Sequence, residues 1–122
     1  EVQFYSNGED LWKTTGGISN SGGNLCLHIC GNLEHFFGAV LAKSGYIRER
    51  DAELSNTDVP RDQLLAGVDA ARHSVLSTLA GLTEQDLDSP YPLEVFGHSM
   101  TTGYFLTHLA THLNYHLGQI NY

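Results

Sequence analysis

The chain has 122 residues, six Lys and Arg against fourteen Asp and Glu, and a formal net charge of −8. This length supports a single domain over residues 1–122, and 41% hydrophobic residues is a globular rather than a disordered composition. The few cationic residues are scattered or stand beside carboxylates, which argues against nucleic acid and against a membrane surface as partners. No apolar run approaches the roughly 18 residues that span a bilayer, and no secretory pattern opens the chain, so we expect a cytoplasmic protein.

The first 24 residues are rich in Gly, Ser, Asn and Thr, which predicts a loop with one helical turn at residues 9–13. The next segment, residues 24–44, is too densely apolar for a surface helix with one narrow stripe. It predicts a nearly buried helix, with Asn20 or Ser21 as its N-cap and Gly45 at its end.

Residues 46–59 alternate charges without a clear period and predict an irregular link. Pro60 stands where a helix would start, and Asp58 is placed to cap it. A single apolar stripe at spacings of three and four then predicts a helix over residues 60–80. This stripe consists of Leu64, Val68, Ala71, Val75 and Leu79.

Residues 83–86 read Thr-Glu-Gln-Asp, which resembles a capping box and predicts a short helical turn. Ser99 can cap a last helix, whose apolar stripe consists of Leu106, Leu109, Leu113, Leu117 and Ile120. No segment indicates a strand. Three apolar helix faces predict an all-α fold, an antiparallel four-helix bundle whose first helix lies upstream of Glu1 or is supplied by a partner subunit.

Seven histidines in so small a chain make this residue the first place to look for function. His108, His112 and His116 stand at i, i+4 and i+8 on the last predicted helix, and an i, i+4 pair lets two imidazoles converge on one metal ion. A helical wheel places His116 at the edge of the leucine stripe, His112 beside it and His108 nearest to solvent. A third ligand must come from another element, and His28 and His35 are both candidates. Such pairs also occur on solvated surfaces, so the spacing alone leaves both interpretations open.

Cys26 and Cys30 lie four residues apart on the first predicted helix, with nearly parallel Cβ directions that are unsuited to a disulfide. They project almost opposite His28 and cannot share a metal ion with it. We expect them to be small buried hydrophobic residues in a reduced compartment. The segment 48–53 holds two Arg, two Glu and one Asp, and is either a solvated link or a loop ordered by ion pairs.

Three motifs together carry a resemblance to a known family. They are Asn24-Leu25-x-Leu27-His28-x-x-Gly31-Asn32, Arg48-x-Arg50-Asp51-x-Glu53, and His112-x-x-x-His116-x-Gly118-Gln119. With these motifs the chain resembles the DinB-like (DinB/YfiT) superfamily over essentially its whole length.

The resemblance implies a four-helix bundle that holds a divalent metal ion (zinc, nickel or iron) with His28, His112 and His116. Other polar residues are then expected to line the pocket: Asn32, His35, His108 and Tyr115. It further implies a homodimer that acts on a small-molecule substrate.

The activity implied by the resemblance is that of a metal-dependent transferase, which uses a low-molecular-weight thiol on an electrophilic substrate. Where such a reaction needs a general base, the candidates are Glu53, Asp51 and Tyr115. The alternatives are a metal-dependent hydrolase with a metal-activated water, and a non-enzymatic metal-binding stress-response protein.

Overall fold

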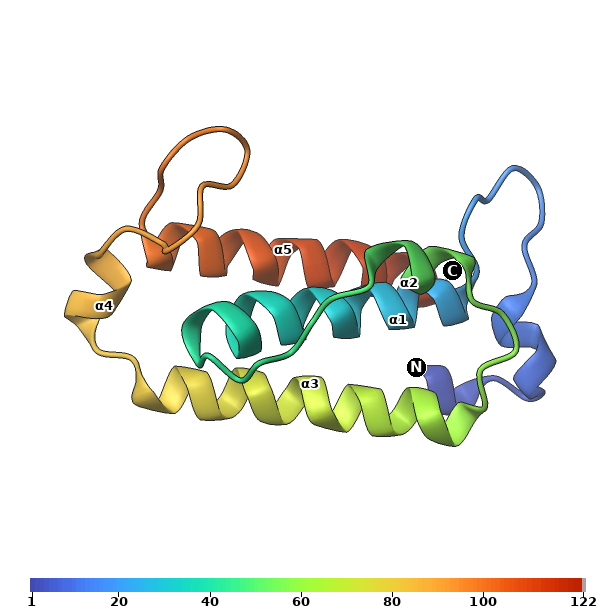
Figure 1. The fold of residues 1–122 in the computed structure, drawn as a ribbon. Coiled ribbons are helices and arrows are strands. Elements are labelled where there is room, and N and C mark those ends of the chain that lie inside the picture. Colours follow the sequence, from blue (N-terminus) through green and yellow to red (C-terminus); the bar gives the residue numbers. More distant parts are fainter. Residues whose placement is uncertain (122) are drawn as a thin grey trace.

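A computed structural model describes residues 1–121 as an all-helical fold, which confirms the predicted fold class. The body consists of three long segments (Figure 1): α1 (Gly22–Leu33) continued by the π-helix η3 (Glu34–Leu41), α3 (Arg61–Gly81) and α5 (Thr102–Asn121). The short elements are the 3₁₀ helices η1 (Val2–Phe4) and η2 (Gly8–Trp12), and the α-helices α2 (Arg50–Ser55) and α4 (Glu84–Asp88). The described residues form two isolated β-bridges and no strand. None of their helices combines the length and the apolar character needed to cross a membrane.

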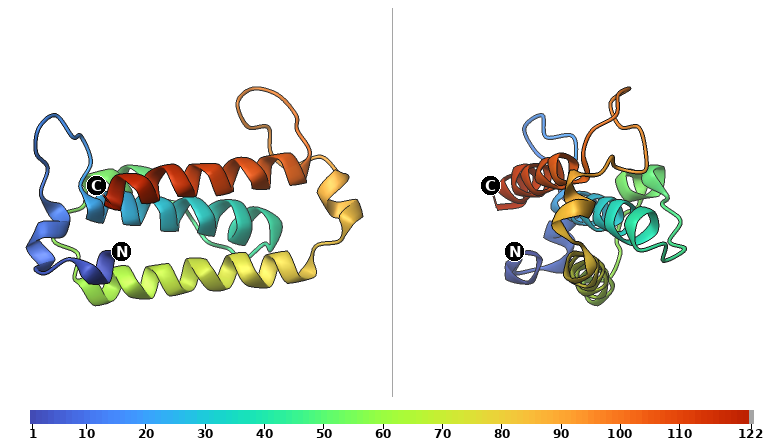
Figure 2. Two further views of the ribbon diagram at one scale, coloured as in Figure 1. Left: turned by 180° about the vertical axis from the view of Figure 1, so that it is seen from behind. Right: turned by 90° about the vertical axis from the view of Figure 1, so that its left-hand side faces the viewer.

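Helix α1 packs against both α3 and α5 (Figures 1 and 2). Helices α1 and α3 run in the same direction, because residues 42–60 return along the bundle, whereas α5 runs antiparallel to both. Residues 1–121 contain three long helical segments, and the fourth helix of the predicted bundle stays a prediction. An apolar groove borders α1, α3 and α5, and it leaves Val68 and Leu117 exposed although both belong to the predicted apolar stripes.

Two of the predicted helix starts are confirmed. The Ser21 side chain accepts a hydrogen bond from the Asn24 N–H and caps α1. The capping box before α4 is complete, since the Thr83 hydroxyl accepts from the Asp86 N–H while the Asp86 carboxylate accepts from the Thr83 N–H. Local side-chain chemistry therefore sets both starts.

The start of α5 differs from the prediction. The Thr101 hydroxyl, and not Ser99, accepts a hydrogen bond from the backbone in the first turn. The reason is that the preceding residues stay extended: the Tyr91 N–H donates to the Met100 carbonyl at 2.9 Å, and the Thr102 N–H donates to the Ser89 carbonyl at 2.8 Å. The helix cannot begin until this pairing ends.

The link predicted as irregular contains helix α2, so that prediction was wrong in part. The Asn24 side-chain amide donates to the backbone carbonyls of Glu53 and Asn56, at 3.1 and 2.8 Å, and holds α2 against α1. Asp58 has a positive φ of 60° and does not cap α3, which begins after Pro60 without a side-chain cap. Long-range contacts thus order a segment that shows no local period.

The first predicted helix changes its winding after Leu33. In the π-helix η3 the Ala42 N–H donates to the Phe37 carbonyl at 3.0 Å, an i to i+5 hydrogen bond. The helix ends at Leu41, earlier than the predicted Gly45, because Lys43 already adopts a positive φ of 53°. Positions after Leu33 therefore face in other directions than an α-helical wheel predicts.

Two buried clusters flank the middle of the bundle. One lies near α4 and is formed by Phe37, Tyr91, Met100, Phe105 and Leu109. The other lies near η1 and η2 and is formed by Val2, Leu11, Cys26 and Leu64. Cys26 is a buried free thiol and Cys30 a partly buried one, as expected from their spacing.

Candidate metal centre

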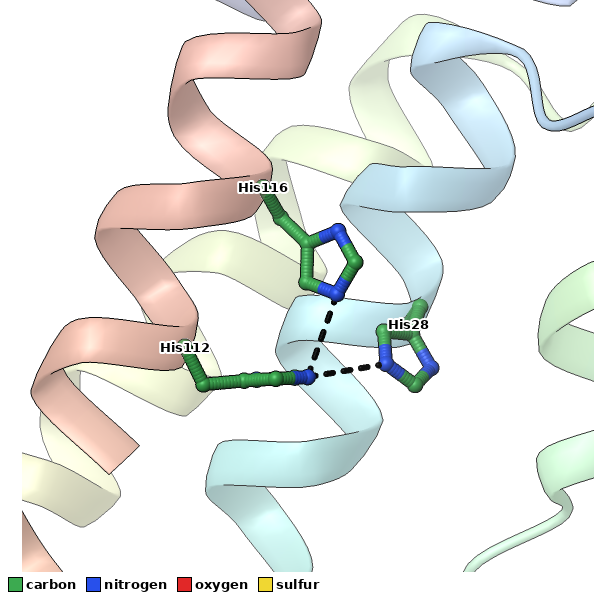
Figure 3. A group of neighbouring side chains, drawn as sticks. All are labelled: His28, His112 and His116. Carbon is green, nitrogen blue, oxygen red and sulfur yellow. Dashed lines mark hydrogen bonds between the residues drawn. The ribbon is translucent and has the colours of Figure 1, made fainter. Parts of the chain in front are cut away.

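The structure brings His28 of α1 together with His112 and His116 of α5 (Figure 3). The Nε2 atom of His112 lies 3.4 Å from that of His28 and 3.1 Å from that of His116. Nitrogen ligands at about 2.0–2.1 Å from a tetrahedral zinc ion are separated by roughly 3.4 Å. The spacing of these nitrogens therefore fits one metal ion, and the three histidines form a cluster that can hold it.

The other ring nitrogens indicate which tautomer two of these histidines adopt. The Nδ1 atom of His28 lies 3.1 Å from a carboxylate oxygen of Glu53, and Nδ1 of His116 lies 2.6 Å from the Gln119 side-chain oxygen. Both partners are acceptors, so each Nδ1 carries the proton and each Nε2 presents a lone pair. The Nε2 lone pairs of His28 and His116 both point toward His112. A cation between the three rings would accept these lone pairs, so the donor set fits a metal ion.

A buried carboxylate orients His28 from behind. Glu53 is only 7% exposed, and Arg48 binds both of its oxygens, with Nε donating to Oε1 at 2.7 Å and Nη2 to Oε2 at 2.9 Å. Arg48 Nη2 also lies 3.4 Å from the His28 Nδ1 atom, but both atoms carry protons, so this contact is not a hydrogen bond. His28, Glu53 and Arg48 thus form one chain of charge-assisted contacts.

Gly31 makes room for this carboxylate. A Cβ atom at position 31 would overlap Oε1 of Glu53 and lie 2.7 Å from its Cδ atom. Gly31 lies in α1 three residues after His28, on the same side of the helix. Only a residue without a side chain allows Glu53 to approach α1 this closely.

Burial keeps two of the three imidazoles neutral. Burial, together with the nearby His116 and His28, lowers the pKa of His112 to about 4. Burial also lowers the pKa of His28, although the neighbouring Glu53 opposes the shift. Neutral imidazole is the form that binds a metal ion, so these two ligands need not lose a proton at pH 7.

A groove of about 390 Å³ opens beside the cluster. Among the residues predicted to line the pocket, Asn32 and His108 lie in it, together with the metal-site residues His28 and His112. The rest of the lining was not predicted from the sequence: Phe36, Arg48, Arg50, Val95, Phe96, Phe105 and Leu109. Several of these lie in the segment 95–105, which only the fold brings to α1.

Two predicted pocket residues do not line this groove. His35 lies at the start of the π-helix, and its ring packs against Phe36 with 4.8 Å between centroids. Tyr115 is 65% exposed and lines a different groove, formed with the N-terminal loop. Of the candidate general bases, Asp51 is exposed, and Glu53 is held behind His28 rather than in the groove.

A family model described as the DinB superfamily matches residues 9–120. The chain belongs to the DinB superfamily. No curated protein and no solved structure matches it significantly. Membership in this superfamily and the three-histidine cluster are together compatible with metal binding.

Proposed function

We propose that this DinB-superfamily protein is a metal-dependent transferase that joins a low-molecular-weight thiol to an electrophilic small molecule. The observation that carries the proposal is the convergence of His28, His112 and His116 through their Nε2 atoms beside an open groove. Three neutral ligands that leave a coordination position open are typical of catalytic rather than structural sites. Zinc, nickel and iron all accept imidazole ligands, and we propose one of them as the resident ion.

A divalent ion at such a site supplies Lewis acidity and stabilises the anionic form of a thiol at neutral pH. The chain's own residues support an anionic reactant. Arg50 lines the groove as an exposed cation, beside the Arg48 that is paired with Glu53, and none of the lining residues is Asp or Glu. The buried Phe105 and Leu109 form an apolar wall of the groove, and this wall limits the access of water to that side of His112.

The same observations favour a thiol over water as the nucleophile. Water-activating metal helices of the H-E-x-x-H type pair the metal with a carboxylate base, and no carboxylate lines this groove. A thiol ionises far more readily than water and needs no such base. Hydrolysis remains the alternative, in which His108, which lines the groove next to His112, would accept the proton.

The test is a thiol panel on protein loaded with zinc, nickel or iron. Glutathione, coenzyme A, bacillithiol and mycothiol are each offered with monochlorobimane, and the fluorescent conjugate is followed above the uncatalysed rate. We expect at least one metal and thiol pair to give turnover that His112→Ala abolishes and His73→Ala, an exposed histidine on α3, leaves unchanged.

Two outcomes would contradict the proposal. Turnover of p-nitrophenyl acetate without any thiol, lost in His112→Ala, would identify a hydrolase instead. Tight metal binding without conjugation by any pair would favour the non-enzymatic alternative.

A further inference from the structure

Two arginines line the groove beside the three histidines, although the protein is acidic. The chain has only six Lys and Arg residues, and two of them, Arg48 and Arg50, line this groove. Arg48 is neutralised by Glu53, whereas Arg50 is exposed and takes part in none of the ion pairs formed among residues 1–121. A guanidinium group presents a planar fork of donors that matches a carboxylate. Arg50 is therefore available to an anionic ligand.

Aromatic rings form the other, apolar side of the same groove. Phe36 and Phe105 pack edge to face with centroids 5.0 Å apart, and Phe105 is buried. The His108 ring lies nearly parallel to Phe105, at 17° and 6.0 Å. These rings give the groove a flat, apolar wall next to the cationic side, and its volume lies within the range of small-molecule sites.

Phe96 occupies a strained position at the edge of this groove. The backbone pairs Val95 with His98, and the two residues between them, Phe96 and Gly97, have positive φ values of 59° and 75°. This is the pattern of a type I′ turn, in which Asn-Gly is strongly preferred and a bulky residue in the first position is strained. Phe96 is 66% exposed, and its ring contacts His108 edge-on, with 4.9 Å between centroids.

Folding does not explain that strain, because an exposed ring contributes little burial to the core. Strained residues persist where a ligand site needs them. In this turn the strain places an aromatic ring at the edge of the groove, beside His108, without making it part of either buried cluster.

We propose that the groove binds a substrate that carries a carboxylate next to a flat apolar group. Arg50 binds the carboxylate, and the apolar group lies between Phe96 and the wall formed by Phe36 and Phe105. The ligand's role as the electrophilic substrate rests on the proposed function, but its binding to Arg50 and Phe96 does not require the metal ion.

The first experiment measures binding rather than turnover, by titration calorimetry on metal-free and zinc-loaded protein. The probes are 3-phenylpropionate and its neutral counterpart 3-phenylpropan-1-ol. We expect the carboxylate to bind about tenfold more tightly than the alcohol in both forms, since one charged hydrogen-bonded contact contributes that much. Arg50→Gln is expected to remove this preference, whereas Arg72→Gln, an exposed position on α3, retains it.

The second experiment uses Phe96→Asn, which creates the Asn-Gly pair that the turn prefers. We expect a higher melting temperature together with weaker binding of both phenyl probes. A stabilised variant that binds both probes as well as the wild type would overturn the role of Phe96.

The results separate this inference from the proposed function. A carboxylate preference that appears only with zinc and survives in Arg50→Gln would mean that the probe ligates the metal, and the assignment to Arg50 would be wrong. Equal affinity for both probes in the metal-free protein would also overturn it. Failure to bind zinc, nickel and iron would refute the metal-dependent function, while the metal-free titrations would still decide whether Arg50 and Phe96 form a binding site.

Discussion

Replacing Gly31 with Ala tests whether the Glu53 carboxylate behind His28 contributes to stability and to zinc affinity. The added methyl group would overlap the end of the Glu53 side chain, which is flexible and can rotate away. Rotation separates Glu53 from Arg48 and His28, so the substitution removes three contacts without altering any of the residues that make them.

The size of the expected loss of stability follows from the burial of the Arg48–Glu53 ion pair. Separating a buried ion pair costs about 3–5 kcal/mol, and the lower value applies because the Arg48 side chain keeps 13% of its surface exposed. Ala in place of Gly within a helix raises the free energy of unfolding by about 1 kcal/mol, because of its higher helix propensity. We therefore expect Gly31→Ala to lower the free energy of unfolding by about 2 kcal/mol. Loss of the carboxylate behind a metal-binding histidine should also weaken zinc affinity by about 10–100-fold.

Gly67→Ala is the matched control. Gly67 lies inside α3, and the nearest atom to a Cβ at this position is the Cys30 sulfur at 3.9 Å, an ordinary contact. This variant should gain about 1 kcal/mol from helix propensity and keep its zinc affinity. Urea denaturation of metal-free protein and competition with a chelator measure the two quantities. Equal stability and equal zinc affinity of the two variants would refute the role assigned to Glu53.

Two further predictions concern zinc binding and pH. Zinc at a free concentration 100-fold above its Kd should raise the free energy of unfolding by about 2.7 kcal/mol and the melting temperature by about 10 °C. His112→Ala should lose this rise and His73→Ala should keep it; an equal rise in both variants would place the zinc elsewhere. The Thr83 hydroxyl and N–H lower the pKa of Asp86 below 3.8, so the capping box stabilises α4 above that pH and the contribution is lost as pH falls through the lower value. Carboxyl NMR titration should show this midpoint, and Thr83→Ala should move it back toward 3.8; an unshifted midpoint in the wild type would contradict the capping geometry.

The two later long helices could be predicted because each carries an apolar stripe at spacings that only a helix places on one face, and the first because residues 24–44 are densely apolar. The caps at Ser21 and Thr83 could also be predicted, because they depend only on residues that are close in sequence. Helix α2 could not be predicted, because its order comes from Asn24, almost thirty residues away in the chain. The π-helix was missed for a related reason: a wheel drawn at 100° per residue assumes α-helical winding throughout, and η3 departs from it.

Sequence spacing also explains what could be foreseen of the site. An i, i+4 pair on one helix brings His112 and His116 together whatever the rest of the chain does. The spacing left His28 and His35 open as the third ligand, and the DinB resemblance pointed to His28. The roles of Glu53 and Gly31 depend on how closely α2 approaches α1, a tertiary distance that has no signature in local sequence.

The three histidines are anchored unequally, and this has a consequence for the kinetics of metal exchange. His28 is fixed by a buried carboxylate on another element, whereas His116 is held by Gln119 of its own helix, on the exposed side. Among residues 1–121 no hydrogen-bond partner is found for Nδ1 of His112. An ion that leaves should therefore detach from the α5 pair first and from His28 last. The rotation of the His112 and His116 side chains would then set the dissociation rate of the ion. His28 would stay in place, ready to bind the next ion.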